Sequence, residues 1–338
     1  MRIELAPMEG ITSYIYRNAV NKYYGGVDTY YTPFISTHKD KTLNFKEKKE
    51  LNPDNNVGIN LIPQVLTSNA DEFIFTATQI KEFGYDHINI NFGCPSGTVT
   101  TKKKGAGALL DVLSLEGLLS DIFSKTDMRI SIKTRMGYED PSEWESLIKV
   151  FEKFPIEELI VHARVREDFY NGRARSIALA EYAFPEEIKF SYNGDIYFKN
   201  DIKIVQNLFP YMDAAMIGRG FISRPWLARE IANDDSMLDV NSEKGLCVFK
   251  EFNHALIDGY NEIMPGEKNT LFKLKELWVY MIKSFEITEL TQSVRNIYLP
   301  DFKLLPNTPK AKKLLKSIRK CNSLKEYEHI IDSIPVFN

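Results

Sequence analysis

Short apolar runs, rich in β-branched or aromatic residues, alternate with amphipathic stretches along the first part of the chain. Such runs are typical of buried strands, and the stretches between them are typical of helices. We predict strands at Ile3–Met8, Thr29–Ile35, Pro63–Leu66, His87–Phe92, Arg129–Thr134, Glu158–Ala163, Ile188–Tyr192 and Ala214–Gly218. Helices are predicted between most of them, for example at Asn69–Phe83, which Gly84 follows as a C-cap residue, and at Pro141–Phe154, with Ser142 as the N-cap.

The alternation predicts an α/β fold, because strands that alternate with helices pair in parallel and the helices cover the sheet. Eight such units over roughly 230 residues match a (β/α)8 TIM barrel in count and length. A doubly wound open sheet is the alternative, but no GxGxxG turn follows the first strand. Between the second and third strands we expect a hairpin-like insertion at Asn55–Ile62 and a solvated charged stretch at Lys39–Lys49.

The pattern changes at a polar break, Asn233-Asp234-Asp235-Ser236, after which no strand pattern returns. Helices are predicted at Val248–Ile263, Thr270–Glu286, Glu289–Asn296, Pro309–Cys321 and Ser323–Ser333. We therefore expect two domains, a catalytic TIM barrel over residues 1–235 and an all-α helical-bundle domain over residues 236–338.

Composition narrows the possible classes. Hydrophobic residues make up 43% and charged residues 26% of the chain, which excludes a disordered protein, a collagen and a coiled-coil rod. The three cysteines are widely spaced, so we expect neither a disulfide framework nor a metal site. The sequence has no signal-peptide pattern and no apolar run of about 18 residues, so we expect a cytoplasmic protein. With a net charge of −3, any nucleic-acid contact must come from local basic patches.

Polar side chains follow most of the predicted strands directly, at the edge where the active site of a TIM barrel lies. These strand ends are Pro7-Met8-Glu9, Gln64, Asn89 to Pro95, Lys133 to Arg135, His162 to Arg164, Asn193-Gly194-Asp195 and Gly218-Arg219-Gly220. Gly194, Gly218 and Gly220 would let backbone N–H groups approach a phosphate, and Arg219 would add charge. The alternative is that these glycines serve tight turns alone.

Several of these side chains are of types that bind cofactors or take part in catalysis. Lys133 suits the anionic ring nitrogen of a reduced flavin, an aldolase-type Schiff base or an interior ion pair. His162 and Arg164 are two residues apart and therefore lie on one face of their strand, where they could hold a phosphate or a substrate carbonyl. We assign Arg164 to the substrate.

Cys94 is the strongest single candidate for a catalytic residue. Most cysteines are small buried hydrophobes, but Cys94 lies at a strand exit between Gly93 and Pro95. A thiol with an ordinary pKa of about 8.5 is protonated at neutral pH and can act as a general acid. The loop that follows, Ser96–Gly107, is rich in Gly, Thr and Lys, and we expect it to act as a lid with a basic patch at Lys102–Lys104.

Together these motifs resemble those of the tRNA-dihydrouridine synthase family over nearly the whole chain, and Asn91-Phe92-Gly93-Cys94-Pro95 is the most specific of them. The resemblance implies an FMN-dependent enzyme that uses NADPH to reduce uridine in tRNA to 5,6-dihydrouridine. A hydride would pass from flavin N5 to uracil C6, and Cys94 would protonate C5. Neither a membrane nor a stable protein partner is implied.

The resemblance also implies roles for individual residues. Those expected to hold FMN are Pro7, Met8, Glu9, Gln64, Lys133, His162, Asn193, Gly194, Asp195, Gly218 and Arg219. Asn91 is expected to orient the uracil and Tyr170 to contact it. The residues of the helical domain expected to contact tRNA are Lys273, Lys275, Tyr280 and Arg295. Lys310–Lys320, a basic segment without an acidic residue, is either a further RNA contact or a solvated helix face.

Three other functions fit parts of the pattern. An FMN-dependent oxidoreductase acting on a small free pyrimidine keeps the barrel chemistry but leaves the basic helical domain unexplained. An aldolase-type enzyme would use Lys133 as a Schiff base over a phosphate site. An RNA-binding protein would use the barrel as a scaffold without catalysis.

Overall fold

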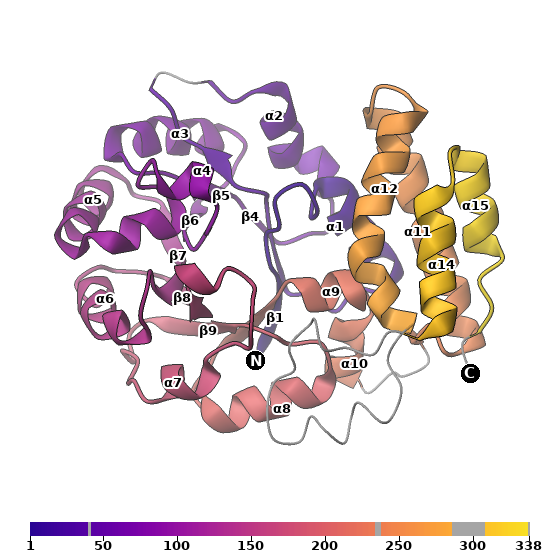
Figure 1. Ribbon diagram of the computed structural model, residues 1–338. Helices are drawn as coiled ribbons and strands as arrows, with labels where there is room; N and C mark the ends of the chain where they lie inside the picture. The colour runs from indigo at the N-terminus through magenta and orange to yellow at the C-terminus, as the bar shows by residue number, and fades with distance from the viewer. Residues whose placement is uncertain (40–41, 234–237, 286–307, 337–338) are drawn as a thin grey trace. The chain divides into compact units, whose positions relative to one another are not determined.

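The computed structural model describes residues 1–39, 42–233, 238–285 and 308–336 (Figure 1). The chain divides into two compact units. The first comprises Met1–Tyr14, Asp28–Gly194 and Val205–Met216, and the second comprises Ile15–Val27, Asp195–Ile204 and Ile217–Asn338. The domain boundary expected at residue 235 lies outside the described residues. The division into residues 1–235 and 236–338 therefore stays a prediction.

Ten strands form one sheet. They are β1 (Arg2–Leu5), β2 (Thr29–Tyr31), β3 (Ile35–Ser36), β4 (Leu61–Ile62), β5 (Gln64–Leu66), β6 (His87–Phe92), β7 (Arg129–Gly137), β8 (Glu158–Val165), β9 (Lys189–Asn193) and β10 (Ala214–Ile217). Their order is β3-β5-β6-β7-β8-β9-β10-β1-β2-β4. Pairing is parallel at β1–β2, β2–β4 and β3–β5, and from β5 through to β10.

The sheet closes into a barrel because two of its strands are each split in two. β2 and β3 lie on the predicted strand Thr29–Ile35, and β4 and β5 are likewise successive pieces of one strand. β2 pairs with β1 and β4, whereas β5 pairs with β3 and β6. The sheet order ends at β3 and β4, and these belong to the same two neighbouring strands, β2 with β3 and β4 with β5. The sheet therefore closes on itself, and eight strands enclose one interior. This confirms the predicted (β/α)8 TIM barrel.

Helices follow the strands as expected. Those up to residue 233 are α1 (Tyr14–Tyr23), α2 (Phe45–Leu51), α3 (Ala70–Glu82), α4 (Gly97–Thr100), α5 (Val112–Lys125), α6 (Trp144–Phe151), α7 (Ser176–Ala180), α8 (Lys199–Leu208), α9 (Arg219–Ser223) and α10 (Leu227–Asn233), with 3-10 helices η1 (Pro53–Asn55), η2 (Gly105–Leu110), η3 (Pro141–Glu143) and η4 (Arg166–Asp168). α3, α5 and α6 pack in sequence along the outside of the sheet (Figure 1). The helix predicted at Pro141–Phe154 is η3 followed by α6, and Asp140 caps it rather than Ser142.

The region between the second and third strands differs from the prediction. Part of the charged stretch Lys39–Lys49 forms α2, because Asn44 caps this helix. The Asn44 Oδ1 accepts the backbone N–H of Glu47 at 2.9 Å, and the Glu47 carboxylate accepts the N–H of Asn44 at 2.8 Å. Asn55–Ile62 forms no hairpin, since its last residues are β4, which pairs in parallel with β2.

Alternate residues of the strands point into the barrel. Tyr31 of β2, Ile160 of β8 and Met216 of β10 pack together although their strands are not neighbours, so they face the common interior. The same side of β8 carries Glu158 before Ile160 and His162 after it. The interior therefore has an apolar middle with polar side chains toward both ends of the strands.

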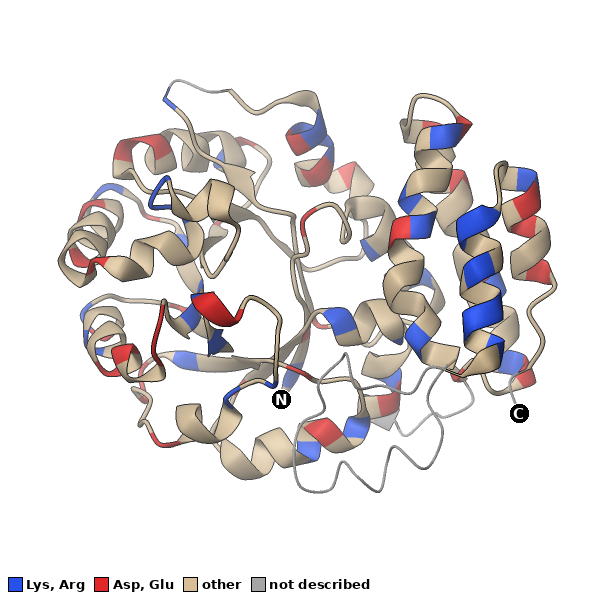
Figure 2. Cartoon of the chain, viewed as in Figure 1, with Lys and Arg blue, Asp and Glu red and all other residues tan. Residues whose placement is uncertain are grey.

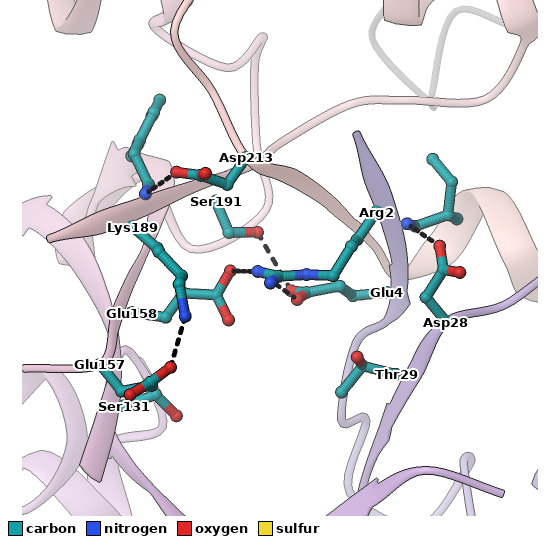
Figure 3. A network of polar contacts seen from close by, with 12 residues as sticks. Arg2, Glu4, Asp28, Thr29, Ser131, Glu157, Glu158, Lys189, Ser191 and Asp213 are labelled. Atoms are coloured by element: carbon teal, nitrogen blue, oxygen red, sulfur yellow. Dashed lines mark hydrogen bonds and ion pairs between the residues drawn. The ribbon is translucent and has the colours of Figure 1, made fainter. Parts of the chain in front are cut away.

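Charged side chains gather at the amino-terminal end of the barrel (Figure 3). Glu4 and Glu158 are both buried. The Arg2 Nη2 donates to Glu158 Oε1 at 2.5 Å and lies 3.8 Å from Glu4 Oε1, while Ser191 Oγ donates to Glu4 Oε2 at 3.0 Å. Burial, together with the charge of Glu158, raises the pKa of Glu4 well above its ordinary value. One arginine thus contacts two carboxyl groups, and Glu4 holds its proton to a higher pH than an exposed glutamate does.

Replacing Glu4 with Gln should stabilise the fold at high pH. Because the pKa of Glu4 is raised in the folded state, the folded protein binds more protons than the unfolded chain above about pH 4.5, and stability is lost as the pH rises. Glu4→Gln removes that loss and keeps a hydrogen-bonding group beside Ser191. The free energy of unfolding should rise by on the order of 1–2 kcal/mol at pH 8 and change little at pH 4. Urea denaturation at both pH values measures this, and an equal change at both would contradict it.

The second unit contains the C-terminal helices. They are α11 (Glu243–Ile263), α12 (Glu267–Met281), η6 (Ile282–Phe285), α14 (Pro309–Lys320) and α15 (Leu324–Asp332). These confirm four of the predicted helices, whereas the one predicted at Glu289–Asn296 lies outside the described residues. Their core is aromatic: the rings of Phe249 and Trp278 meet edge to face at 5.9 Å, and Trp278 Nε1 donates to the Tyr327 hydroxyl at 2.6 Å. Among the described residues, no helix has both the length and the apolar character needed to cross a bilayer.

Candidate active site

The loop that carries Cys94 is held by hydrogen bonds from its own strand. Asn91, in β6, accepts the backbone N–H groups of Gly93 and Cys94 through its Oδ1, each at 2.9 Å. Its Nδ2 donates to Gln64 Oε1 at 2.8 Å, which fixes the orientation of the Asn91 amide. Asn91 therefore positions Cys94 directly, a role that the sequence did not indicate. Its expected contact with a uracil stays a prediction.

The segment expected to form a lid is compact. It contains α4 and η2, and Gly105 in η2 has φ of +56°, with its Cβ position only 2.8 Å from the carbonyl oxygen of Cys94, so glycine is required there. Lys104 is only 7% exposed, and its Nζ donates to the carbonyl and the hydroxyl of Thr37. The expectation that Lys104 belongs to an exposed basic patch at Lys102–Lys104 is therefore wrong, because the Lys104 side chain is buried and bonded to Thr37.

A row of hydrogen-bonded polar side chains crosses three neighbouring strands inside the barrel. Gln64 Nε2 donates to Asn89 Oδ1 at 2.8 Å, and Asn89 Nδ2 donates to Ser131 Oγ at 2.9 Å. All three residues are fully buried. Because each amide has partners on both its oxygen and its nitrogen, Gln64 and Asn89 are each held in one orientation.

Cys94 is half-buried, and its surroundings keep it protonated. Burial raises the pKa of the thiol above its ordinary value, and this effect outweighs a backbone hydrogen bond from Ser96 and the positive charges of Arg135 and Lys133. A protonated thiol at the end of a strand can donate a proton to a bound substrate.

Lys133, in the middle of β7, lies near Cys94. Its Nζ donates to Asn193 Oδ1 at 3.1 Å, and Asn193 Nδ2 in turn donates to the carbonyl of Met216 at 2.7 Å. Burial, with Arg135 as a second contribution, lowers the pKa of Lys133 to about 7. The described residues place no carboxylate in an ion pair with Lys133. This is a desolvated cation whose protein partner is a neutral amide, and it suits a ligand that brings negative charge.

Arg135 is a residue of the site to which the sequence analysis assigned no role. It is fully buried and donates to three carbonyl oxygens, those of Gly93 at 2.9 Å, Val165 at 2.7 Å and Phe169 at 2.8 Å. Burial lowers its pKa to about 10. Arg135 thus joins the loops that follow β6 and β8. Its position two residues after Lys133, on the same face of the strand, was the signal available in the sequence.

His162 and Arg164 meet as their spacing predicted. Arg164 is fully buried, and its Nη1 lies 3.0 Å from His162 Nε2, while its Nη2 donates to the carbonyl of Gly172 at 2.7 Å. A guanidinium can only donate, so Nε2 must be the acceptor, and the proton of the neutral imidazole must be on Nδ1. Arg164 therefore acts on His162. Its expected contact with the substrate stays a prediction.

Tyr170 lies beside this pair and is half exposed. Its ring centroid is 6.1 Å from that of His162, and the guanidinium carbon of Arg135 lies 5.4 Å from it. The preceding residue, Phe169, has φ of +50°, and Arg135 holds its carbonyl. The loop thus presents a flat aromatic face next to the polar strand ends, which suits stacking against a planar base.

The first strand end forms a turn. β1 ends at Leu5, so Pro7, Met8 and Glu9 lie beyond it. The N–H of Met8 donates to Thr12 Oγ1 at 2.8 Å, and the Met8 carbonyl accepts the N–H of Thr12 at 3.0 Å. Glu9 is exposed, with Lys46 Nζ 3.6 Å from its carboxylate. The expected flavin contacts of Pro7, Met8 and Glu9 stay predictions.

The loops expected to bind phosphate have their own fixed geometry. Asn193 and Gly194 belong to the first unit, whereas Asp195, Gly218 and Arg219 belong to the second. In the second unit, Arg219 Nη2 donates to Asp195 Oδ1 at 2.7 Å, and this carboxylate is fully buried. A Cβ on Gly220 would lie 2.0 Å from the carbonyl oxygen of Ile196, so close packing of the two loops requires glycine there.

The two lysines of α12 that were expected to contact tRNA already have hydrogen-bond partners within the protein. Lys273 is 8% exposed, and its Nζ lies 2.8 Å from Glu276 Oε2. Lys275 donates to the carbonyls of Arg319 at 3.1 Å and Cys321 at 2.5 Å. Tyr280 is half-buried, and Arg295 lies outside the described residues.

The amine of Lys133 should titrate near pH 7 in the flavin-free protein, far below its ordinary 10.5. Because the pKa is lowered in the folded state, the unfolded chain binds more protons between these values, and this group lets stability rise with pH across that window. The Cε chemical shift of 13C-labelled lysine measures the titration, and Lys133→Met assigns the signal. A Lys133 titration above pH 10 would contradict the desolvation.

The imidazole of His162 should carry its proton on Nδ1 at neutral pH. In 15N spectra, Nε2 should have the shift of an unprotonated ring nitrogen. Arg164→Lys, which keeps a donor, should preserve this tautomer, whereas Arg164→Met should allow protonation at Nε2. A protonated Nε2 in the unaltered protein would contradict its role as acceptor from Arg164. Circular dichroism of each variant controls for folding.

Comparisons with known proteins agree with these motifs. A sequence model described as dihydrouridine synthase (Dus) matches residues 4–272. tRNA-dihydrouridine synthase B of Pasteurella multocida is 30% identical over 229 residues, which are 68% of each chain. A tRNA-dihydrouridine(16) synthase of Neisseria meningitidis serogroup A is 30% identical over 295 residues, covering 83% of this chain and 86% of its own. A solved old yellow enzyme homologue of Zymomonas mobilis has a TM-score of 0.48 at 10% identity, covering 69% of this chain and 89% of its own.

The extent of these matches decides the family. The matched model spans well over half of the chain, and it includes the end of β1, the Cys94 loop, Lys133 and the strand ends up to Arg219. The predicted class of enzyme, a flavin-dependent oxidoreductase of this kind, is confirmed with it. The chain belongs to the dihydrouridine synthase family.

Proposed function

We propose that this protein is a tRNA-dihydrouridine synthase, which reduces uridine in tRNA to 5,6-dihydrouridine with FMN as prosthetic group and NADPH as the electron donor. The observation that carries the proposal is the half-buried Cys94, held through its backbone by Asn91 and kept protonated by burial. The names of the relatives support tRNA as the substrate.

The residues of the first unit fit a flavin. Lys133 is a half-buried cation whose described partner is a neutral amide, and Gln64 is a buried amide held in one orientation. These groups suit the electron-rich edge of an isoalloxazine ring, and the Nδ1–H of His162 suits an acceptor on the cofactor. Pro7, Met8 and Glu9 would lie against the ring. When bound, FMN reduced by NADPH supplies a hydride from N5 to uracil C6.

The ribityl phosphate is assigned to the glycine-containing loops. Asn193, Gly194 and Asp195 come from the end of β9, and Gly218 and Arg219 from the end of β10. Arg219 already neutralises Asp195, so the pair together adds little net charge. Backbone N–H groups of the loops would therefore be the main phosphate donors.

Cys94 supplies the proton. Saturating the C5=C6 bond of uracil takes one hydride at C6 and one proton at C5, and the Cys94 Sγ–H gives its proton to C5. The resulting thiolate lies near the positive charges of Arg135 and Lys133, which oppose the penalty that burial places on it. Asn91 keeps the thiol in place by holding two successive backbone N–H groups.

The substrate base must leave its stack to reach this edge of the barrel, at a cost of a few kcal/mol. Tyr170, half exposed and backed by Arg135, offers a face on which the extruded base can stack. Asn91 and Arg164 complete the expected substrate contacts. A reductase acting on a small free pyrimidine is the alternative, and it differs in requiring no RNA.

Cys94→Ala should abolish most turnover while leaving flavin and tRNA binding intact. Loss of a general acid lowers kcat by about 10²–10⁴-fold. The matched control is Cys247→Ala, which removes an exposed cysteine from α11 and should leave kcat unchanged. Mass spectrometry of dihydrouridine in unmodified tRNA measures the product, and flavin absorbance measures cofactor content.

Normal turnover by Cys94→Ala would remove the thiol from the mechanism. Reduction of free uridine at the same rate as tRNA would favour the small-molecule reductase. A purified protein that holds no flavin even after reconstitution would refute the proposal as a whole.

A further inference from the structure

We propose that the outer face of α14 is the principal surface through which this chain binds the phosphates of its RNA substrate. The surface consists of Lys312, Lys313, Lys316, Arg319 and Lys320, and we call it the α14 basic face. The inference rests on the proposed function for the identity of the RNA. The resemblance assigns the RNA contacts to Lys273, Lys275, Tyr280 and Arg295, and the sequence left Lys310–Lys320 open between a further RNA contact and a solvated helix face.

All five cations of this face are exposed, and they lie on one side of the helix. The buried residues of α14 are Ala311 and Ile318, which share the opposite side. At 100° per residue the five cations fall within an arc of about 120°, directly away from the buried side. Figure 2 shows the resulting column of positive charge along α14, whose twelve residues include no acidic one.

The cations of the α14 basic face are not neutralised within the described part of the chain. None of them forms an ion pair with a described carboxylate. Two of the three acids of the neighbouring α15 are engaged elsewhere, because Glu326 accepts the backbone N–H of Asn322 at 2.7 Å and Asp332 accepts from His254 at 2.8 Å; the third, Glu328, forms no ion pair with any of the five cations. Because like charges on one helix face repel, such a face costs stability unless a polyanion binds it.

Helix α14 is fixed at both ends. Thr308 caps its first turn, accepting the N–H of Ala311 at 3.2 Å. Lys275, on α12, donates to the carbonyls of Arg319 and Cys321 and so satisfies backbone acceptors at the C-terminal end. The charge of Lys275 therefore serves to hold α14, and the helix presents its five cations from a rigid backbone.

The contrast with α12 decides which helix makes the contact. Lys273 is 8% exposed and paired with Glu276, so it has little charge to offer a phosphate. By comparison, Lys312, Lys316 and Lys320 form a row with spacings of about 6 Å along the helix. A row of unpaired cations can follow successive phosphates of one strand and release their counterions.

A nucleic acid fits this surface better than a membrane does. A helix that binds a lipid surface must insert an exposed apolar face between its basic residues and the bilayer. The apolar residues of α14 lie outside the α14 basic face: Ala311 and Ile318 are buried, and Leu314 and Leu315 are half-buried. A face that carries only cations is typical of contacts to a phosphate backbone.

The experiment compares two double variants of the flavin-loaded, full-length protein. Lys312→Gln with Lys316→Gln removes two charges from the α14 basic face. The control, Lys268→Gln with Lys325→Gln, removes two exposed charges from α12 and α15. Affinity for unmodified tRNA is measured from 50 to 200 mM salt, together with flavin content, kcat and KM for dihydrouridine formation.

The α14 variant should lose about two units of the slope of log K against log salt, and its affinity should fall tenfold or more. Its KM should rise by the same factor, with kcat at saturating tRNA and flavin content unchanged. The control variant, and also Lys273→Gln, should keep the slope of the unaltered protein. These results would support the assignment to α14.

An unchanged slope in the α14 variant, or an equal loss in the control, would overturn the inference. So would loss of binding to phosphatidylserine vesicles with tRNA binding intact, since that would make the face a membrane contact. If the unaltered protein binds tRNA through α14 but forms no dihydrouridine, the proposed function fails and the surface stands. If both double variants form dihydrouridine with the KM for tRNA of the unaltered protein, the function stands and the surface fails.

Discussion

Polar groups inside the barrel have lost water, and each must find a protein partner or change its protonation state. The two ends of the barrel meet this constraint differently. At the amino-terminal end, Arg2 lies close to two buried carboxyl groups, and the pKa of Glu4 is raised well above its ordinary value. At the carboxyl-terminal end, Lys133 has an amide for a partner, and its pKa falls to about 7. The first arrangement is closed within the protein, whereas the second is completed only by a ligand.

The same constraint suits Cys94 to its proposed role as proton donor. Asn91 uses its carbonyl oxygen on two backbone N–H groups and its amide nitrogen on Gln64, so the strand and the loop are locked together. Arg135 adds a second lock by joining the carbonyls of Gly93 and Phe169. The thiol is thereby held in a site dry enough to raise its pKa, yet close to two cations that oppose the penalty on the thiolate once the proton has left.

The barrel and the strand-end residues could be predicted from the sequence because they follow local periodicity. HININF alternates polar and apolar residues, so Asn89 and Asn91 had to share a face. What the sequence could not show were partners supplied by distant segments. Lys104 was expected on the surface, but it reaches Thr37, 67 residues away. Lys273 and Lys275 were assigned to RNA by position, whereas burial, Glu276 and the end of α14 determine what they do. The capping of α2 could have been predicted, because Asn44 and Glu47 have the spacing of a capping box, but the many charged residues around them favoured a solvated stretch.

The chain as a whole carries a net charge of −3, so its affinity for a polyanion must depend on how its cations are distributed and not on their number. Most of the lysines and arginines with described partners are paired with carboxylates on the same unit, as Lys81 is with Asp127 and Lys153 with Glu116. Such pairs contribute little field at a distance, because the two charges cancel beyond a few ångströms. A helix such as α14, with six cations and no acid in twelve residues, is therefore a larger source of positive potential than its share of the basic residues implies. In the proposed function, α14 binds RNA because its cations have no carboxylate partners among the described residues. Lys133, which likewise has no such partner there, is proposed to bind the cofactor for the same reason.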